Sequence, residues 1–348
     1  MDTIQIAIKI GVDKIGDVSQ RELQEIRKSI DYMKSPYGHT YCDCLEISTA
    51  GNFIVKISYP RFFAGINAYL ISSSKECMEV QEEFYKEIKS NKVLRDAEIT
   101  LNRVDIPFTF LMKENYSFKS YKKIYQILNY VYKIKNPKAC PKAFTDIEKF
   151  EAETLIYADT PNIGGYNKKV TIYDQHNNIK AKTGDGSYLC SIEREYKDLD
   201  RRMRIEVSKR VQRKEFSVEE FGKFNIFKEY STKYREYILD NLFDLDEIES
   251  LYNKKSEELK KILSEYRADK SSFFYEVFIY KNIDHIHDYE IMRRALKLCI
   301  KNVKTRENAI TAIRRILDYY EFTDEIIIME TYKTIKEIRE VMEKHFID

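Results

Sequence analysis

The spacing of the apolar residues changes partway along the 348-residue chain, and this change constrains the fold more than any other feature. In the first part, beginning with residues 3–10, apolar and polar residues alternate, which is typical of strands with one buried face. After about Phe216 the apolar residues recur mostly at the three- and four-residue spacing of amphipathic helices. We therefore expect an α+β protein. An antiparallel sheet with helices on one face should span residues 1–220, and a mainly helical region should span residues 221–348.

Individual elements follow from the same patterns, together with turn and capping residues. The expected strands lie at 4–10, 97–112, 152–159 and 201–213, with two more in 41–60 around the Ala50-Gly51-Asn52 turn and one in 168–178 that ends in a turn. The expected helices lie at 22–33, 74–90, 118–134, 232–268, 289–303, 306–320 and 324–345, with Thr323 as the N-cap of the last.

Composition narrows the class of protein. The net charge is only +2, so the chain is not a polycation, and nucleic-acid binding would have to come from local basic patches. The six cysteines form no CxxC pair, the N-terminus has no signal-peptide pattern, and no segment has the roughly 20 apolar residues of a membrane helix. No GxxxxGK[ST] or GxGxxG loop is present, which argues against an ATPase or an enzyme with a nucleotide cofactor. We expect a soluble cytoplasmic protein with reduced cysteines and no membrane partner.

Three expected strands carry polar residues that alternate with aliphatic ones. If the aliphatic sets of these strands pack on helices, the polar sets share the other face of the sheet. The polar sets are Arg103 and Asp105 in the first strand, Lys169, Thr171 and Tyr173 in the second, and Arg204, Glu206 and Ser208 in the third. One face would then carry two carboxylates and a tyrosine framed by three basic side chains.

Such a group of side chains has a chemical use. Two carboxylates, Asp105 and Glu206, can hold Mg²⁺ or Mn²⁺, which prefer oxygen ligands and stabilise charge on a phosphodiester. The hydroxyl of Tyr173 can attack phosphorus once it loses its proton, which gives a covalent intermediate. The alternative is a solvated face of amphipathic strands, in which tyrosine is simply a favoured strand residue.

Four stretches of the sequence occur in order over most of residues 1–225. They read "NFIVKISYPRFFAGINAYLISS", "LNRVDIPFTF", "KKVTIYDQHNNI" and "RMRIEVSKRVQRKEF". Together they resemble the gene II and gene X replication initiators of filamentous phages, and the later stretches also resemble the Rep-trans initiators of rolling-circle plasmids. The resemblance rests on the order and spacing of the four stretches together.

The resemblance implies a metal-dependent enzyme that nicks one strand at a double-strand origin. A tyrosine becomes joined to the 5′-phosphate, and the free 3′-OH primes synthesis. By position in the motifs, Tyr173 is the nucleophile and Asp105 and Glu206 are the metal ligands. The implied phosphate contacts are Arg103, Lys169 and Arg204. The implied partners are origin DNA with a locally single-stranded nick site and a host helicase and polymerase.

The sequence departs from the resemblance at two points. Plasmid relatives usually carry Lys two residues after the tyrosine, where this chain has Gln175, so that Lys169 or another neighbour would have to contact the scissile phosphate. A third metal ligand is also not evident, with Glu46 and Asp174 as candidates.

Two segments are basic and could contact DNA. The first, residues 118–138, contains Lys122 and Lys123 with interspersed tyrosines that could stack on bases. The second continues the strand of Glu206 through Lys209 and Arg210. The alternative for the first segment is a solvated helix face with packed tyrosines. The C-terminal region is a candidate for origin binding or for oligomerisation, including a homodimer.

Two other functions remain open. The His285-Ile286-His287 triplet is the pattern with which another superfamily of nicking enzymes, the relaxases, binds its metal, although flanking aspartates favour a polar turn here. A non-catalytic DNA-binding protein that controls replication could also have this fold.

Overall fold

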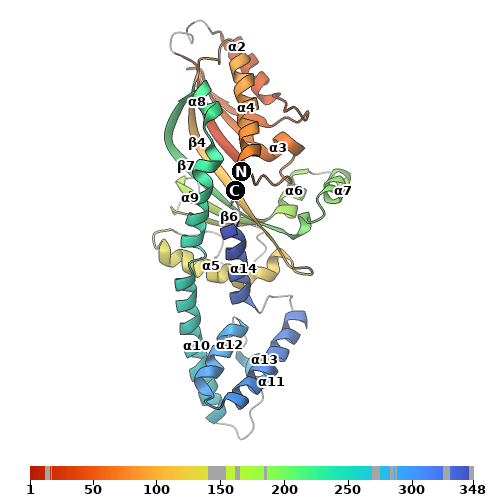
Figure 1. Cartoon of the computed structure of the whole chain (residues 1–348), viewed down its shortest axis with the longest axis vertical. Coiled ribbons are helices and arrows are strands. Elements are labelled where there is room, and N and C mark those ends of the chain that lie inside the picture. Colours follow the sequence, from red (N-terminus) through yellow and green to blue (C-terminus); the bar gives the residue numbers. More distant parts are fainter. Residues whose placement is uncertain are drawn as a thin grey trace.

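The computed structural model contains a long twisted antiparallel sheet, with a helical region extending from one end of it (Figure 1). It describes residues 1–11, 16, 18–139, 154–160, 165–183, 186–268, 275–282, 286, 288–323 and 330–344. The architecture is α+β, with the sheet in the N-terminal part and helices in most of the C-terminal part, as the apolar spacing predicts.

The sheet has seven strands in the described part of the chain, in the order β2-β3-β1-β4-β7-β6-β5, and every neighbouring pair is antiparallel. The strands are β1 (Thr3–Lys9), β2 (Cys42–Ile47), β3 (Asn52–Ser58), β4 (Glu98–Leu111), β5 (Thr154–Ala158), β6 (Lys168–Asp174) and β7 (Arg202–Ser217). Because β4 and β7 are the longest strands and pair along nearly their whole length, they form the centre of the sheet. The predicted turn between β2 and β3 is present, with Gly51 at a φ of +69°.

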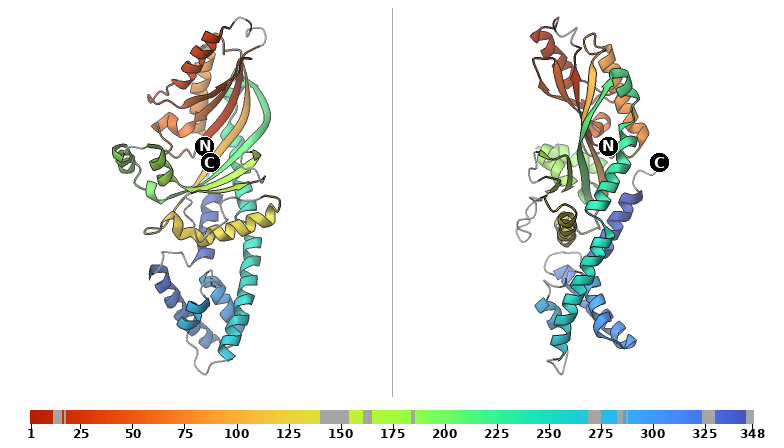
Figure 2. Two further views of the ribbon diagram at one scale, coloured as in Figure 1. Left: turned by 180° about the vertical axis from the view of Figure 1, so that it is seen from behind. Right: turned by 90° about the vertical axis from the view of Figure 1, so that its left-hand side faces the viewer.

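The N-terminal part also contains helices between and after the strands. They are α2 (Gln20–Asp31), α3 (Tyr59–Ala64), α4 (Ser74–Ser90), α5 (Lys122–Lys135), α6 (Gln175–Thr183), α7 (Gly186–Glu195) and α8 (Val218–Lys223). In α2, α4 and α8 the N-cap serine and a glutamate three residues later bind each other's backbone N–H groups. The helices α2 and α4 lie over one face of the sheet, and α5 crosses below its end (Figure 2).

The C-terminal helices begin along the sheet and return to it. They are α9 (Ile226–Asn241), α10 (Leu245–Ala268), α11 (Tyr275–Asn282), α12 (Tyr289–Cys299), α13 (Val303–Thr323) and α14 (Thr331–Lys344). Both α9 and α14 contact β4, whereas α10 to α13 extend away from the sheet (Figure 1). The division into two domains at residue 220 stays a prediction. Within the described ranges, no helix combines the length and the apolar character needed to cross a membrane.

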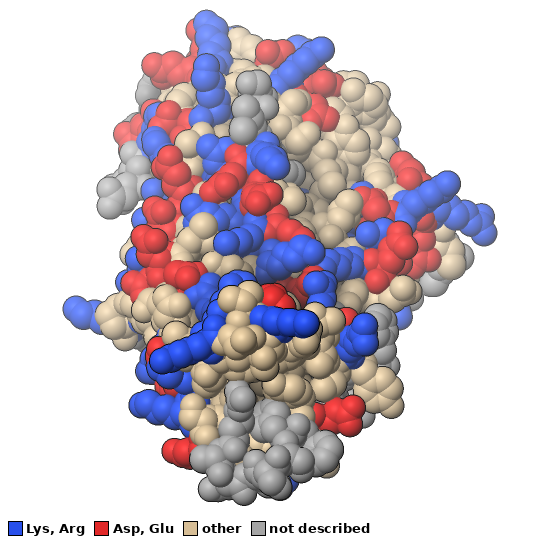
Figure 3. All heavy atoms as spheres, turned by 60° about the horizontal axis from the view of Figure 1, so that its bottom comes forward, with Lys and Arg blue, Asp and Glu red and all other residues tan. Residues whose placement is uncertain are grey.

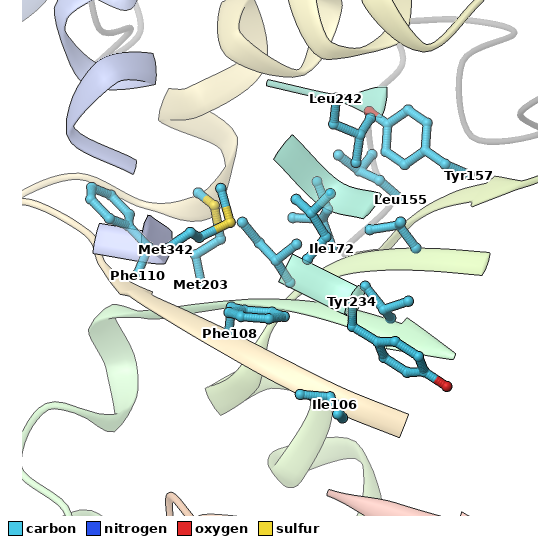
Figure 4. Packing of buried hydrophobic residues seen from close by; sticks show 14 of the residues in the cluster. Ile106, Phe108, Phe110, Leu155, Tyr157, Ile172, Met203, Tyr234, Leu242 and Met342 are labelled. Carbon is cyan, nitrogen blue, oxygen red and sulfur yellow. The ribbon is translucent and has the colours of Figure 1, made fainter. Parts of the chain in front are cut away.

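The main core lies between the aliphatic face of the sheet and these helices. Figure 4 shows Phe108 of β4 and Ile172 of β6 pointing toward Leu242, which follows α9, and Met342 of α14. All four side chains are almost fully buried, and full burial of a side chain of this size is worth roughly 1.5–3 kcal/mol. Because the helices of this core pack on the aliphatic side of the sheet, the opposite, polar face is free to form a functional site.

Three boundaries differ from the sequence prediction. The residues after β6 form helix α6 and not a turn, because the Asp174 carboxylate accepts hydrogen bonds from the backbone and side chain of Asn177 and begins the helix. The helix predicted over 232–268 is two helices, since Asp244 caps the start of α10. Thr323 lies at the end of α13, so its prediction as an N-cap is wrong.

Candidate active site

The register of three neighbouring strands brings the predicted site residues onto one face. Strand β7 lies between β4 and β6, with Ser208 opposite both Asp105 and Lys169. Glu206 is one step along β7 on the same face, and Tyr173 of β6 is one step further, opposite Arg204. Directly opposite residues point to the same side of a sheet, so the two carboxylates and the tyrosine form one group.

This polar face forms the floor of a cleft of about 680 Å³. One wall is the segment 65–67 that follows α3, and the other is α6 with Asn178 and Lys182. Gly65 permits the turn out of α3, since its φ is +72° and a Cβ atom there would lie 2.9 Å from His39 Nδ1. Five residues singled out from the sequence line this cleft: Arg103, Asp105, Lys169, Tyr173 and Glu206.

Tyr173 lies at the floor of the cleft and is 6% exposed. Its hydroxyl donates a hydrogen bond to Glu206 Oε2 over 3.2 Å. Burial, and after it the neighbouring charge of Glu206, raises the pKa of the Tyr173 hydroxyl well above its usual range, against a smaller opposing effect of Arg204. The phenol is therefore protonated at neutral pH and has a carboxylate in place to accept its proton.

The carboxylates of the site lie in one cleft, where Asp105 is almost fully buried and Glu206 is partly exposed. Asp105 pairs with Arg103 over 3.1 Å, yet its Oδ1 atom is buried and has no hydrogen-bond partner in the described part of the chain. Burial raises the pKa of Asp105 to about 6, because it outweighs the opposing effect of Arg103. Burial, together with Asp2 and Asp105, raises the pKa of Glu206 well above its usual range, and Glu206 shares a hydrogen bond with Asp2.

The fit of a divalent cation depends on these carboxylates. No group of three or more His, Cys, Asp and Glu side chains is arranged to hold a metal ion in the residues that the structure describes. Asp105 and Glu206 nevertheless suit Mg²⁺ or Mn²⁺, because these ions use one or two carboxylates and complete their shell with water and phosphate oxygens. The unpartnered Asp105 oxygen and the raised pKa values fit a site that gains from a positive charge.

The two residues considered as a third ligand lie elsewhere. Asp174 points to the opposite face from Tyr173 and caps α6. Glu46 is exposed on the edge strand β2, which two other strands separate from β4. Asp2 is the additional carboxylate in the cleft.

Arg204 lies beneath the cleft and is fully buried, so in this conformation it is not accessible to a phosphate. Its Nη1 atom donates to both the backbone and the side-chain oxygen of Asn67, over 3.3 Å and 3.0 Å. Gln175, which is 1% exposed, donates to the same backbone oxygen over 2.6 Å, and Asn67 in turn donates to Asp2 over 3.3 Å. Gln175, which directly follows β6, and Arg204 of β7 therefore attach the wall of the cleft to its floor.

The other basic residues are distributed over three places. Arg210 is exposed at the edge of the cleft, where its guanidinium lies 5.1 Å from the ring centre of Tyr166. Lys209 points to the opposite face, near Lys168, and burial with that neighbouring positive charge lowers the pKa of Lys209. Lys122 and Lys123 lie on α5 outside the cleft, and Lys123 donates to the backbone oxygen of Ile286.

The tyrosines of the basic segment 118–138 do not form the base-stacking surface considered from the sequence. Tyr121, Tyr125 and Tyr132 are buried, and only Tyr130 among the four is substantially exposed. Tyr132 packs instead on Tyr157 of β5, with ring centres 5.2 Å apart. The packed-helix interpretation therefore holds for these residues.

The histidines of the alternative metal site, His285 and His287, lie outside the described residues. Ile286 between them is buried, and Asp288 caps α12. Ile286 and Asp288 lie between α11 and α12 or at the start of α12, and they belong to no strand of the sheet.

Several residues of the cleft were not identified from the sequence. They are Asp2, Lys56, Arg61, Asn67, Asn178 and Lys182. Alternation places Lys56 on the polar face, because Val55 and Ile57 are apolar, but it does not tell which strands become neighbours. Comparisons with protein-family models, with curated proteins and with solved structures found no match to this chain.

Proposed function

We propose that this protein is a rolling-circle replication initiator of the filamentous-phage type, which nicks one DNA strand with Tyr173 as nucleophile. The observation that carries the proposal is the contact of 3.2 Å between the Tyr173 hydroxyl and Glu206, in a cleft that also contains Asp105 and Lys169. A nucleophile, a proton acceptor and cations near one point are what phosphodiester transfer requires.

In the proposed reaction, Tyr173 Oη attacks the phosphorus of the scissile phosphodiester and its proton passes to Glu206. The P–O3′ bond breaks, which leaves a 5′-phosphotyrosyl link and a 3′ oxygen that takes up a proton to give the 3′-OH primer. The raised pKa of Glu206 makes it a stronger base toward the phenol than an ordinary carboxylate. Lys169, which has no carboxylate within 4.0 Å of its ammonium in the described residues, can contact the negatively charged phosphate oxygens.

Asp105 and Glu206 are the residues that would hold Mg²⁺ or Mn²⁺. Such an ion, when bound, would stabilise negative charge on the phosphate oxygens. Asp2 lies close enough to Glu206 to share its hydrogen bond and can help to hold a proton there.

The burial of Tyr173 favours a second candidate, a DNA-binding protein that controls replication without cutting. Tyr173 is 6% exposed, so a phosphodiester can reach it only by entering the cleft. In this alternative the cations of the cleft bind DNA and the carboxylates serve only the fold.

Incubation with a supercoiled plasmid separates the two candidates. The plasmid should carry the DNA that flanks the gene, with Mg²⁺ or Mn²⁺ in the buffer. If the protein is a nicking enzyme, nicked circles and a protein–DNA adduct should form. Both should be absent with Tyr173→Phe. Both should be present with Tyr69→Phe, because Tyr69 lies outside the cleft. Nicking that persists in Tyr173→Phe would exclude this nucleophile, and tight binding without any nicking would favour the second candidate.

A further inference from the structure

A row of polar residues crosses the open face of the sheet beside the cleft. Lys56 of β3 lies opposite Gln5 of β1, Gln5 lies opposite Arg103 of β4, and Arg103 lies opposite Arg210 of β7. The four residues occupy one rung on four adjacent strands and therefore point to the same face. Three of them are cations, in a line perpendicular to the strands.

Arg103 of this row pairs with Asp105 over 3.1 Å, whereas the Lys56 ammonium is not in an ion pair within the described residues. No carboxylate lies within 4.0 Å of the Lys56 ammonium in the described part of the chain, and its cross-strand neighbour Asp43 is paired with Arg61 over 2.7 Å. Lys56 and Arg103 both line the cleft, and Arg210 is exposed at its edge. On the face seen in Figure 3, positive and negative side chains are interspersed.

Tyr166 fixes the end of the row. It is 7% exposed, and its ring lies 4.8 Å from the Lys169 ammonium and 5.1 Å from the Arg210 guanidinium. A cation over an aromatic face is attracted by the charge distribution of the ring, so Tyr166 helps to hold Lys169 and Arg210 in position. Burial raises the pKa of Tyr166 although Arg103 opposes this, so the ring remains a neutral support between the cations.

The row is offset from the carboxylates by a defined distance. Arg103 and Asp105 are two residues apart on β4, which is about 7 Å along a strand. From Lys56 to Arg210 the row spans three strand spacings, or about 14 Å. A chain held along the row therefore passes beside the reacting phosphate and not over it.

We propose that the row Lys56–Gln5–Arg103–Arg210 binds the backbone of single-stranded DNA flanking the nick site, and that the strand crosses the sheet perpendicular to its strands. This inference rests on the proposed function for the identity of the DNA. An unpaired strand suits the site because Tyr173 lies at the floor of a cleft with walls on two sides. Gln5 adds an uncharged amide donor between the cations.

Binding of a short fluorescent oligothymidylate, measured by anisotropy over a range of KCl concentrations, tests the row. Without divalent metal the assay needs no cleavage. Lys56→Ala should weaken binding about two- to fivefold and should reduce the slope of log affinity against log salt by about 0.7, the value for one phosphate contact on a single strand. Lys56→Arg should restore both quantities.

Lys9→Ala is the matched control, because Lys9 is an exposed lysine on the same face of β1 as Gln5 but two rungs away from the row. It should leave the salt slope nearly unchanged. An unchanged salt slope in Lys56→Ala, or an equal change of the salt slope in Lys9→Ala, would contradict the proposal that the row binds DNA. A duplex that binds more tightly than the single strand with the same dependence on Lys56 would overturn the choice of single-stranded DNA.

The proposed DNA binding by the row and the proposed nicking activity are tested by different experiments, so either can be contradicted while the other stands. If the plasmid is nicked but Lys56→Ala binds DNA like the wild type, the row is wrong and the proposed function stands. If Lys56→Ala loses one phosphate contact but no adduct forms, the row stands as a DNA-binding surface without the enzyme.

Discussion

Replacing Asp105 by Asn should stabilise the protein while it abolishes nicking. The folded state raises the pKa of Asp105 from 3.8 to about 6, so ionised Asp105 is less favourable in the folded chain than in the unfolded one. A difference of about 2 pKa units corresponds to about 3 kcal/mol once the group is ionised in both states. Asparagine resembles the protonated carboxyl and avoids this cost, so at about pH 8 the variant should gain about 3 kcal/mol in free energy of unfolding.

The sign and size of this gain depend on pH. The folded pKa is raised, so the contribution of Asp105 to stability is greatest below its unfolded pKa and declines as pH rises through about 6. At about pH 5 the carboxyl is mostly protonated in the folded state, and the gain should fall to about half. Urea unfolding of the metal-free wild type and variant at both pH values measures the difference.

Asp43→Asn is the control for this measurement. Asp43 lies on the edge strand β2 and forms a partly exposed ion pair with Arg61 of α3. Its change in stability should stay below about 1 kcal/mol. If Asp105→Asn destabilises the protein at about pH 8, or gains equally at both pH values, the description of Asp105 as a buried, unfavourably ionised carboxylate is wrong.

Two further predictions concern buried polar residues away from the reacting atoms. Gln175→Ala should lower the free energy of unfolding by about 1–3 kcal/mol, because the backbone oxygen of Asn67 loses a buried donor. Gln175→Lys should also destabilise the protein, because it places an ammonium at a position that is 1% exposed. A Lys variant as stable as the wild type that also nicks faster would instead make position 175 a phosphate contact. Burial raises the pKa of Asp288 to about 7, so the ionised carboxyl should cost about 3 kcal/mol more stability at about pH 8 than at about pH 5. In urea unfolding, Asp288→Asn should therefore gain about 3 kcal/mol relative to the wild type between these two pH values. A difference between wild type and variant that does not change with pH would contradict the raised pKa.

Much of the sheet and one face of the candidate site could be predicted from the sequence, because alternation fixes the face of each side chain. It placed Asp105, Tyr173 and Glu206 on the polar side of their strands, and the structure brings these strands together. Alternation also placed Arg204 on that face but could not show that the segment around Asn67 covers it. Burial of a polar side chain depends on a contact between distant parts of the chain.

Strand order could not be predicted, and the unexpected cleft residues follow from it. β1 lies between β3 and β4, which carries Lys56 and Gln5 into line with Arg103. The helix after Tyr173 was missed because its polar sequence, Gln175–Thr183, has almost no apolar periodicity and is fixed by the Asp174 cap. Strand order depends on pairing between distant segments and α6 depends on a local cap, so the spacing of apolar residues predicts neither.

The measurement that tests the account most directly is the site of covalent attachment. After incubation with nickable DNA, the adduct can be digested with nuclease and protease and its peptides identified by mass spectrometry. The account predicts a nucleotide phosphate on Tyr173. Attachment to Tyr166, the nearby tyrosine held between Lys169 and Arg210, would contradict the account, as would the absence of any attached nucleotide from DNA that has been nicked.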